Sequence, residues 1–166
     1  MMEARPRQPT MLQKEEKPGE MPVTEKVLTA KVRETKKSAY ANEIDVDGHI
    51  LNADEPEPDG GKNLGPSPHE ILLAALGACT AMTVRWYALR HDIPLESVDV
   101  ALTYRRDHLE GHSGLLDIFA KEVNFTGPAL TAEQRRKLLD VAGKCPVQKL
   151  LEGMPVIRTS ERTAPN

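Results

Sequence analysis

The stretch SPHEILLAALGACTAMTV, residues 67–84, decides the fold of this 166-residue chain. Ser67 is placed to cap a helix, Pro68 suits its first position, and Glu70 completes a capping box three residues after Ser67. The residues after Glu70 are apolar or small all around the expected helix rather than along one stripe. Because such a helix is usually surrounded by protein, the pattern predicts a central helix that continues to about His91 and is enclosed by other elements.

Gly77 lies in the middle of the expected helix, two residues before Cys79. A glycine at such a position costs up to about 1 kcal/mol relative to alanine. We therefore expect either that another element packs closely against this turn or that the fold needs space beside Cys79.

Strands and shorter helices are expected on both sides of the central helix. From Glu25 to about Leu51 apolar and polar residues alternate, which predicts two or three strands with a hairpin at residues 34–37 and a turn at Asp47-Gly48. Residues 53–67 form a loop whose glycines permit close approach of the backbone. After the central helix we expect, in chain order, a strand over 98–105, a polar loop over 106–114, a strand over 118–125, a helix from a capping box at 131–134 to Gly143, a short helix from Pro146 to Gly153 and a strand over 156–159. This order predicts an α+β domain with antiparallel sheet against the central helix.

Length and composition indicate one domain and argue against several classes of protein. We expect a disordered tail over residues 1–22, a single domain over 23–160 and a frayed end over 161–166. A formal net charge of -3 and few aromatic residues offer no surface for nucleic acid. The longest uncharged apolar stretch, residues 71–84, is too short to cross a bilayer. Because residues 1–22 resemble neither a secretory nor a transit signal, we expect a cytoplasmic protein that does not bind membranes.

The two cysteines, Cys79 and Cys145, carry the chemistry that the sequence offers. They are too few for a disulfide scaffold, and no histidine lies at ligand spacing from either, which disfavours a zinc site. A position at a helix N-terminus beside Lys144 favours the thiolate of Cys145, which is the reactive form. Burial in an apolar helix raises the pKa of Cys79, so this residue needs a cationic or hydrogen-bonding partner to react. The alternative is that both cysteines are small core residues.

A family resemblance gives the two cysteines a shared role. Residues 65–83, followed by Lys144-Cys145-Pro146-Val147, resemble the OsmC/Ohr family of thiol-dependent organic hydroperoxide reductases. The resemblance covers about residues 25–160, and residues 53–56 with Gly60-Gly61 are most similar to the OsmC-like branch. It implies an OsmC-like fold in which antiparallel sheets wrap around long buried central helices in an intertwined homodimer, with the active sites at the subunit interface.

The resemblance also implies a reaction. Cys79 corresponds to the peroxidatic cysteine, which would take an oxygen from an organic hydroperoxide and become a sulfenic acid. Cys145 corresponds to the resolving cysteine, which would form a disulfide with Cys79. An external dithiol, for which a lipoylated protein is one candidate, would reduce that disulfide, and neither a metal nor an organic cofactor is implied.

The residues that support the cysteines in this family match less closely. His69 occupies the position of the family's active-site glutamate, and Glu70 follows one residue later. We favour the explanation of Glu70 as the capping partner of Ser67, and His69 is either a hydrogen-bonding residue near the site or an exposed residue of the first turn. Arg33 is the nearest candidate for the arginine that the family supplies from its N-terminal hairpin, and Arg85 and Arg90 are other possible cations.

The main hypothesis from the sequence is therefore a cytoplasmic, homodimeric cysteine-based peroxidase that prefers organic hydroperoxides, because a pocket beside an apolar helix suits an alkyl tail. One alternative is a non-catalytic dimeric module of the same fold that binds a small apolar ligand or a protein thiol. A third possibility is a cysteine-dependent hydrolase or acyl-transfer enzyme that uses Cys79 with His69.

Overall fold

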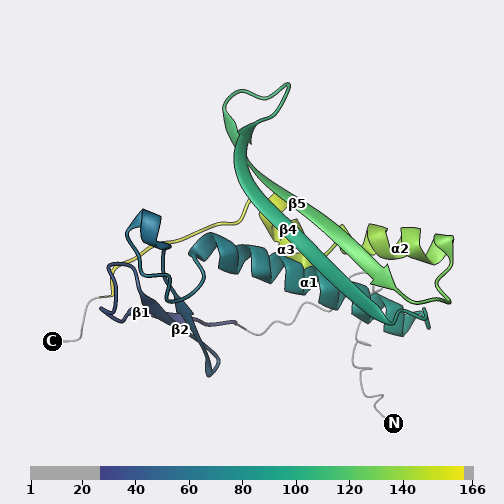
Figure 1. Cartoon of the computed structure of the whole chain (residues 1–166), viewed down its shortest axis with the longest axis horizontal. Helices are drawn as coiled ribbons and strands as arrows, with labels where there is room; N and C mark the ends of the chain where they lie inside the picture. The colour runs from purple at the N-terminus through teal and green to yellow at the C-terminus, as the bar shows by residue number, and fades with distance from the viewer. Residues whose placement is uncertain (1–26, 163–166) are drawn as a thin grey trace, which may run out of the picture.

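The capping box at Ser67 and Glu70 begins the central helix where the sequence predicts it. In the computed structural model, which describes residues 27–162, helix α1 (Pro68–Arg90) runs through the middle of the chain (Figure 1). The Ser67 side chain accepts from the backbone N–H of Glu70, and the Glu70 carboxylate accepts from the backbone N–H of Ser67. The predicted tail over 1–22 and the last four residues of the predicted frayed end lie outside the described residues.

Two antiparallel sheets and two shorter helices accompany α1, so the fold is α+β as predicted. The first sheet has the order β1-β2-β3, and the second is the hairpin β4-β5. The bounds are β1 (Lys31–Glu34), β2 (Asn42–Val46), β3 (His49–Ala53), a 3-10 turn η1 (Glu57–Asp59), β4 (Ser97–His108), β5 (Leu115–Thr126), α2 (Ala132–Ala142) and α3 (Pro146–Glu152). The polar loop after β4 is shorter than predicted because both strands extend farther into the hairpin.

The hydrophobic core lies where the second half of α1 meets β4, β5 and α2. Its central residues include Val84, Tyr87, Phe125, Leu138 and Val141, all buried. Figure 1 shows the β4-β5 hairpin crossing α1 and its tip pointing away from the helix, with α2 beside the far end of β5. Burial of these side chains removes apolar surface from water, the main stabilising term of such a core. The helix, the hairpin and α2 therefore form one packed unit.

Close packing at Gly77 explains its place in mid-helix. A Cβ atom at this position would lie 2.8 Å from Leu102 Cδ1 of β4. Strand β4 therefore packs directly against this turn of α1, which confirms the first of the two explanations expected from the sequence.

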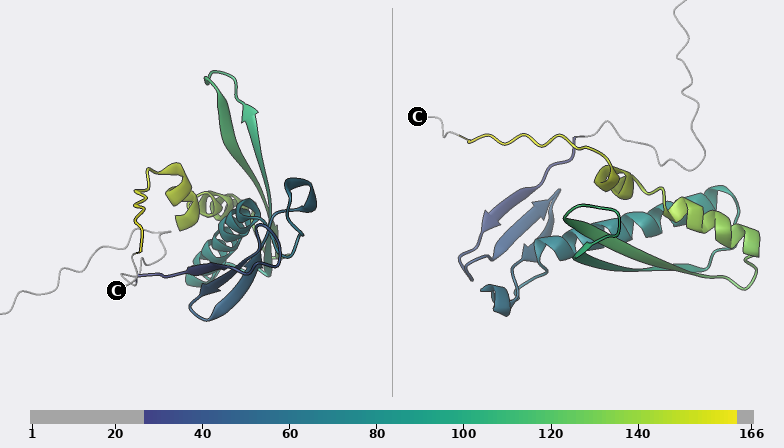
Figure 2. Two further views of the ribbon diagram at one scale, coloured as in Figure 1. Left: turned by 90° about the vertical axis from the view of Figure 1, so that its left-hand side faces the viewer. Right: turned by 90° about the horizontal axis from the view of Figure 1, so that it is seen from above.

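The three-stranded sheet extends from the N-terminal end of α1 (Figure 2). Its tight turn has positive φ at both Asp47 (54°) and Gly48 (86°), the geometry of the two-residue hairpin predicted there. Apolar side chains on this sheet, among them Val32, Ile50 and Leu51, are exposed in the single chain.

The loop between β3 and α1 is organised by a buried carboxylate. Asp54 accepts hydrogen bonds from the Ser38 hydroxyl (2.6 Å) and from the backbone N–H groups of Glu55 (3.0 Å), Lys62 (3.0 Å) and Leu64 (3.3 Å). Burial opposes ionisation of this group, but the four donors outweigh it, so the pKa of Asp54 lies below its usual range.

The glycines of this loop allow the close backbone approach predicted from the sequence. A Cβ atom at Gly61 would lie 1.8 Å from the Glu55 carbonyl oxygen, and one at Gly65 would lie 2.3 Å from the Asn52 carbonyl oxygen. Any larger residue would therefore displace the backbone on which the start of α1 depends.

Two expectations about the surroundings of α1 are corrected by the structure. The helix is covered on one side only, since Met82 and Leu89 are 64% and 71% exposed. The strand expected over residues 156–159 is absent from the described chain, where this segment has no strand pairing and Ile157 is 85% exposed. A strand needs a partner edge, and this segment pairs with neither sheet of the described chain.

Helix α1 is also longer than the uncharged stretch over residues 71–84, which is too short to cross a bilayer, because the helix continues through Arg85 to Arg90. Among the described residues it is the one helix long and apolar enough to cross a membrane by length and composition. Its contacts with β4, α2 and α3 give it the position of a core helix.

Candidate thiol site

The fold brings the two cysteines together although they are far apart in the sequence. Cys79 lies in the middle of α1, and Cys145 is the N-cap of α3, where its sulfur accepts from the backbone N–H of Gln148 (3.4 Å). The Cys79 thiol hydrogen-bonds to Cys145, and the backbone N–H of Val147 donates to the Cys79 sulfur. Both cysteines are free, Cys79 being partly exposed and Cys145 fully buried. The start of α3 therefore holds two thiols in contact.

This environment controls the protonation of Cys79. Burial is the largest effect and raises the pKa of its thiol, and the neighbouring Cys145 raises it further through its charge and its hydrogen bond. The Val147 N–H, which is the second-largest effect, and the Thr83 hydroxyl act in the opposite direction but do not outweigh burial and Cys145 together, so the pKa remains above its ordinary value. The single chain thus holds Cys79 mainly as a thiol, as the sequence predicted for a cysteine in an apolar helix without a cationic partner.

A lysine that the sequence analysis did not single out lies behind Cys145. Lys121 of β5 donates to the Thr80 hydroxyl (3.1 Å), the Ala142 carbonyl (2.7 Å) and the Gln148 side-chain carbonyl (2.7 Å). Thr80, next to Cys79 on α1, in turn donates to the Cys145 sulfur (3.4 Å). The sequence did contain a signal, since Lys121 interrupts an otherwise apolar strand face that includes Phe119, Val123 and Phe125.

The structure gives Glu70 the capping role that was one of its two explanations. Its carboxylate accepts from the Ser67 backbone N–H (2.7 Å) and from the Ser67 hydroxyl (2.9 Å). These two hydrogen bonds lower the pKa of Glu70, with the backbone donor contributing most. In the single chain, Glu70 therefore serves the start of α1.

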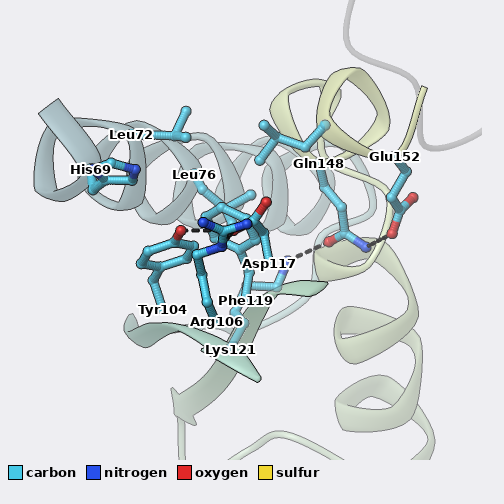
Figure 3. Close-up of a pocket in the computed structure, with 11 residues that line it drawn as sticks. His69, Leu72, Leu76, Tyr104, Arg106, Asp117, Phe119, Lys121, Gln148 and Glu152 are labelled. Atoms are coloured by element: carbon cyan, nitrogen blue, oxygen red, sulfur yellow. Dashed lines mark hydrogen bonds and ion pairs between the residues drawn. The ribbon is translucent and has the colours of Figure 1, made fainter. Parts of the chain in front are cut away.

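His69 faces a large cavity between α1 and the β4-β5 hairpin. The cavity has a volume of about 1090 Å³, and Figure 3 shows His69, Leu72 and Leu76 of α1 on one side of it and residues of the hairpin on the other. The His69 ring stacks on Tyr104 with ring centroids 5.2 Å apart. His69 precedes Cys79 by ten residues, a separation of about 15 Å along a helix. The Cys79 and His69 pair that a hydrolase would need is therefore not assembled.

The three arginines considered from the sequence have other partners in the described chain. Arg33, on β1, is 78% exposed and forms an ion pair with Glu43 of β2 (2.9 Å). Arg85 donates to the backbone carbonyls of Leu95 and Glu96, and Arg90 lies over the Trp86 ring. Lys121 is thus the cation whose hydrogen bonds lead to the thiol pair.

The described residues contain no group of three or more His, Cys, Asp and Glu side chains that could hold a metal ion.

The chain is thus an α+β protein in which two free cysteines are in contact, one on the long central helix and the other at the N-cap of α3. The family model for OsmC-like proteins matches residues 60–160, and the chain belongs to the OsmC family.

Solved structures share this fold. An OsmC-like protein from Mycoplasma pneumoniae superposes with a TM-score of 0.63 at 20% identity, over 78% of this chain and 90% of the other. An organic hydroperoxide resistance protein from Legionella pneumophila gives 0.60 at 19% identity, over 79% and 93% of the two chains. A protein of the same description from Elizabethkingia anophelis gives 0.58 at 19% identity, over 78% and 91%. Comparison with curated protein sequences finds no match.

Removal of Cys145 should make Cys79 more reactive, because Cys145 is one of the groups that raise the pKa of Cys79. In Cys145→Ala we expect the pH profile of Cys79 alkylation by iodoacetamide to move to lower pH and the rate at pH 8 to rise severalfold, because a larger fraction of Cys79 is then the thiolate. Cys79→Ala provides the background labelling. A profile that stays in place or moves to higher pH would contradict the assigned contact.

Proposed function

We propose that this protein is a cysteine-based peroxidase that reduces organic hydroperoxides to alcohols, and the contact between Cys79 and Cys145 is the observation that carries the proposal. The Cys79 thiolate attacks the distal oxygen of ROOH, the O–O bond breaks, and the alkoxide takes up a proton to leave as ROH. Cys79 is then a sulfenic acid. The Cys145 thiol condenses with it to give a disulfide and water.

The exposure of the two cysteines supports their proposed roles. Cys79 is partly exposed and can meet a substrate, whereas Cys145 is fully buried and can meet only a group that is already in the site. Disulfide formation requires Cα atoms within about 7 Å, and a hydrogen bond between the two side chains is compatible with that requirement. Cys79 is therefore proposed as the peroxidatic residue and Cys145 as the resolving one.

The cavity beside α1 supports an organic rather than a water-like substrate. Its walls include the apolar side chains of Leu72, Leu76, Phe119 and Leu151, with Tyr104 and His69 at one side. Apolar walls favour an alkyl or aryl group through the hydrophobic effect. The cavity reaches Lys121 and Gln148, which adjoin the thiol pair.

The descriptions of two solved relatives support this chemistry, because both are organic hydroperoxide resistance proteins. We propose a cytoplasmic location, where thiols are kept reduced, and an external dithiol, such as a lipoylated protein, as the electron donor. No metal or organic cofactor takes part in the proposed reaction.

The peroxidase should consume both thiols with one equivalent of cumene hydroperoxide. We expect rapid loss of the two thiols and a Cys79–Cys145 cross-link in the peptide map, no cross-link in Cys145→Ser, and no reaction in Cys79→Ser. Thiol counting and peptide mass spectrometry measure this. Two thiols that stay free after prolonged exposure would reject the peroxidase and favour the alternative of a non-catalytic module that binds a small apolar ligand or a protein thiol.

We further propose that two copies form an intertwined homodimer, because the single chain leaves apolar surface uncovered on three elements. These are the outer face of α1 with Met82 and Leu89, the β1-β2-β3 sheet, and the extended segment around Ile157. A second copy would also bring another hairpin with Arg33 to the assembly, which is a possible source for the cation that Cys79 lacks. In the single chain, Glu70 and His69 lie at the end of α1 next to the chain's own β1-β2-β3 sheet.

Sedimentation equilibrium should give twice the chain mass of 18.4 kDa. A charge placed on the uncovered face, Met82→Arg, should weaken the dimer at least tenfold, since burial of an unpaired charge is strongly unfavourable. The matched control Arg136→Ala lies on the exposed surface of α2 and should leave the mass unchanged. A monomeric wild-type protein at micromolar concentration would show that this face is not covered by a second copy.

A further inference from the structure

Lys121 is a partly buried cation whose three hydrogen-bond acceptors are all uncharged. It comes from β5 and binds the Thr80 hydroxyl, the Ala142 carbonyl at the end of α2 and the side chain of Gln148 on α3. Figure 3 shows the bond from Lys121 to Gln148 at the edge of the cavity. Three bonds satisfy the three N–H donors of a lysine, but no carboxylate among these partners balances its charge.

Two of these partners also bind the sulfur of Cys145. The Thr80 hydroxyl and the backbone N–H of Gln148 each lie 3.4 Å from Cys145 Sγ. Thr80 is fully buried, and its hydroxyl hydrogen is shared between that sulfur and the Leu76 carbonyl at 2.8 Å. When an ammonium group donates to a hydroxyl oxygen, the hydroxyl becomes a stronger donor. The ammonium therefore strengthens the bond that Thr80 gives to a negatively charged sulfur.

We propose that Lys121 is a positioning residue that acts through Thr80 to stabilise negative charge on the Cys145 sulfur, so that Cys145 is the thiolate that leaves when an external dithiol reduces the Cys79–Cys145 disulfide. The inference rests on the proposed function for the existence of that disulfide in the reaction cycle.

The reduction has two displacement steps. One thiolate of the dithiol attacks Cys79 Sγ and forms a mixed disulfide, the Cys79–Cys145 bond breaks, and its electron pair leaves on Cys145 Sγ. The second thiol of the reductant then displaces Cys79 and closes the reductant's own disulfide. One proton of the dithiol ends on Cys79, and the other passes to water for as long as Cys145 remains the stabilised thiolate, so the protein gains two electrons and the reductant loses two.

Both the exposure of the two cysteines and the stability of the leaving thiolate favour attack of the dithiol on Cys79. Cys145 is fully buried, so an external thiol reaches Cys79 first. In thiol exchange the better stabilised thiolate leaves faster. Cys79 from α1 and Lys121 from β5 are the titratable groups that the contacts bring toward Cys145. Glu152 of α3 lies behind Gln148, and α2 presents only the Ala142 carbonyl.

Lys121 also joins β5 to the ends of α2 and α3, so a substitution there lowers stability whatever its chemical role. The reduction potential of the disulfide is a readout that separates the two roles. Thr80→Val removes the hydroxyl but leaves the bonds from Lys121 to Ala142 and Gln148 in place, so it interrupts only the path to the sulfur.

The experiment uses the full chain oxidised with diamide, without any peroxide, and equilibrated with mixtures of reduced and oxidised dithiothreitol. We expect Lys121→Met and Thr80→Val each to make the disulfide about tenfold harder to reduce, a change of about 30 mV to more negative potential. The double variant should shift little further, because both substitutions interrupt one path. The control Arg136→Met removes an exposed charge on α2 and should shift the equilibrium less than about twofold.

A trapped intermediate tests the direction of attack. Quenching the reduction with acid and mapping the peptides should place the reductant on Cys79. Unchanged potentials in both single variants, additive shifts in the double variant, or a reductant bound to Cys145 would overturn the proposal, as would failure of diamide to form the disulfide. If Lys121→Met does not fold, Lys121→Gln, which removes the charge but keeps an amide donor, takes its place beside Thr80→Val. A protein that forms the disulfide with diamide but not with a hydroperoxide fails the proposed function and still tests this inference.

Discussion

The apolar surface of α1 is the constraint on which the rest of the structure depends. A helix with small and apolar residues on all sides must be covered by protein, and this chain covers one side with β4, α2 and α3. The closest contact, at Gly77, sets the hairpin against the helix, and the same covering places the N-cap of α3 over Cys79. The thiol site is thus a consequence of how the central helix is buried.

The site also shows how burial and charge compete at a cysteine. Removal of the Cys79 sulfur from water favours the neutral thiol, and a second sulfur in contact favours it further. Donors gather instead around Cys145, where the Gln148 N–H and the Thr80 hydroxyl meet and Lys121 stands behind them. Among the described residues, Arg33, Arg85 and Arg90 have other partners, so the proposed dimer is one source of a cation for the activation of Cys79.

Local rules made part of this architecture predictable from the sequence. The capping box at Ser67, the turn at Asp47-Gly48 and the N-cap position of Cys145 each depend on a few neighbouring residues, and all three are confirmed. The family resemblance identified the pair of cysteines, and the structure brings that pair into contact.

The remaining features depend on contacts between distant segments. Lys121 lies on a strand, where a lysine usually points to solvent, and only the approach of three helices turns it into part of the site. The segment at 156–159 has a strand pattern but pairs with neither sheet of the described chain. Arg33 was considered as a support for Cys79, yet its position relative to that residue depends on assembly, which sequence patterns do not describe.

The most direct test of the central claim, that the covering of α1 pairs two thiols for redox chemistry, is a crystal structure of the protein after oxidation by an organic hydroperoxide. We expect Cys79 Sγ and Cys145 Sγ at a bonded distance of about 2.0 Å, with the start of α3 still packed against α1. Two separate sulfur atoms, each oxidised alone or unchanged, would contradict it.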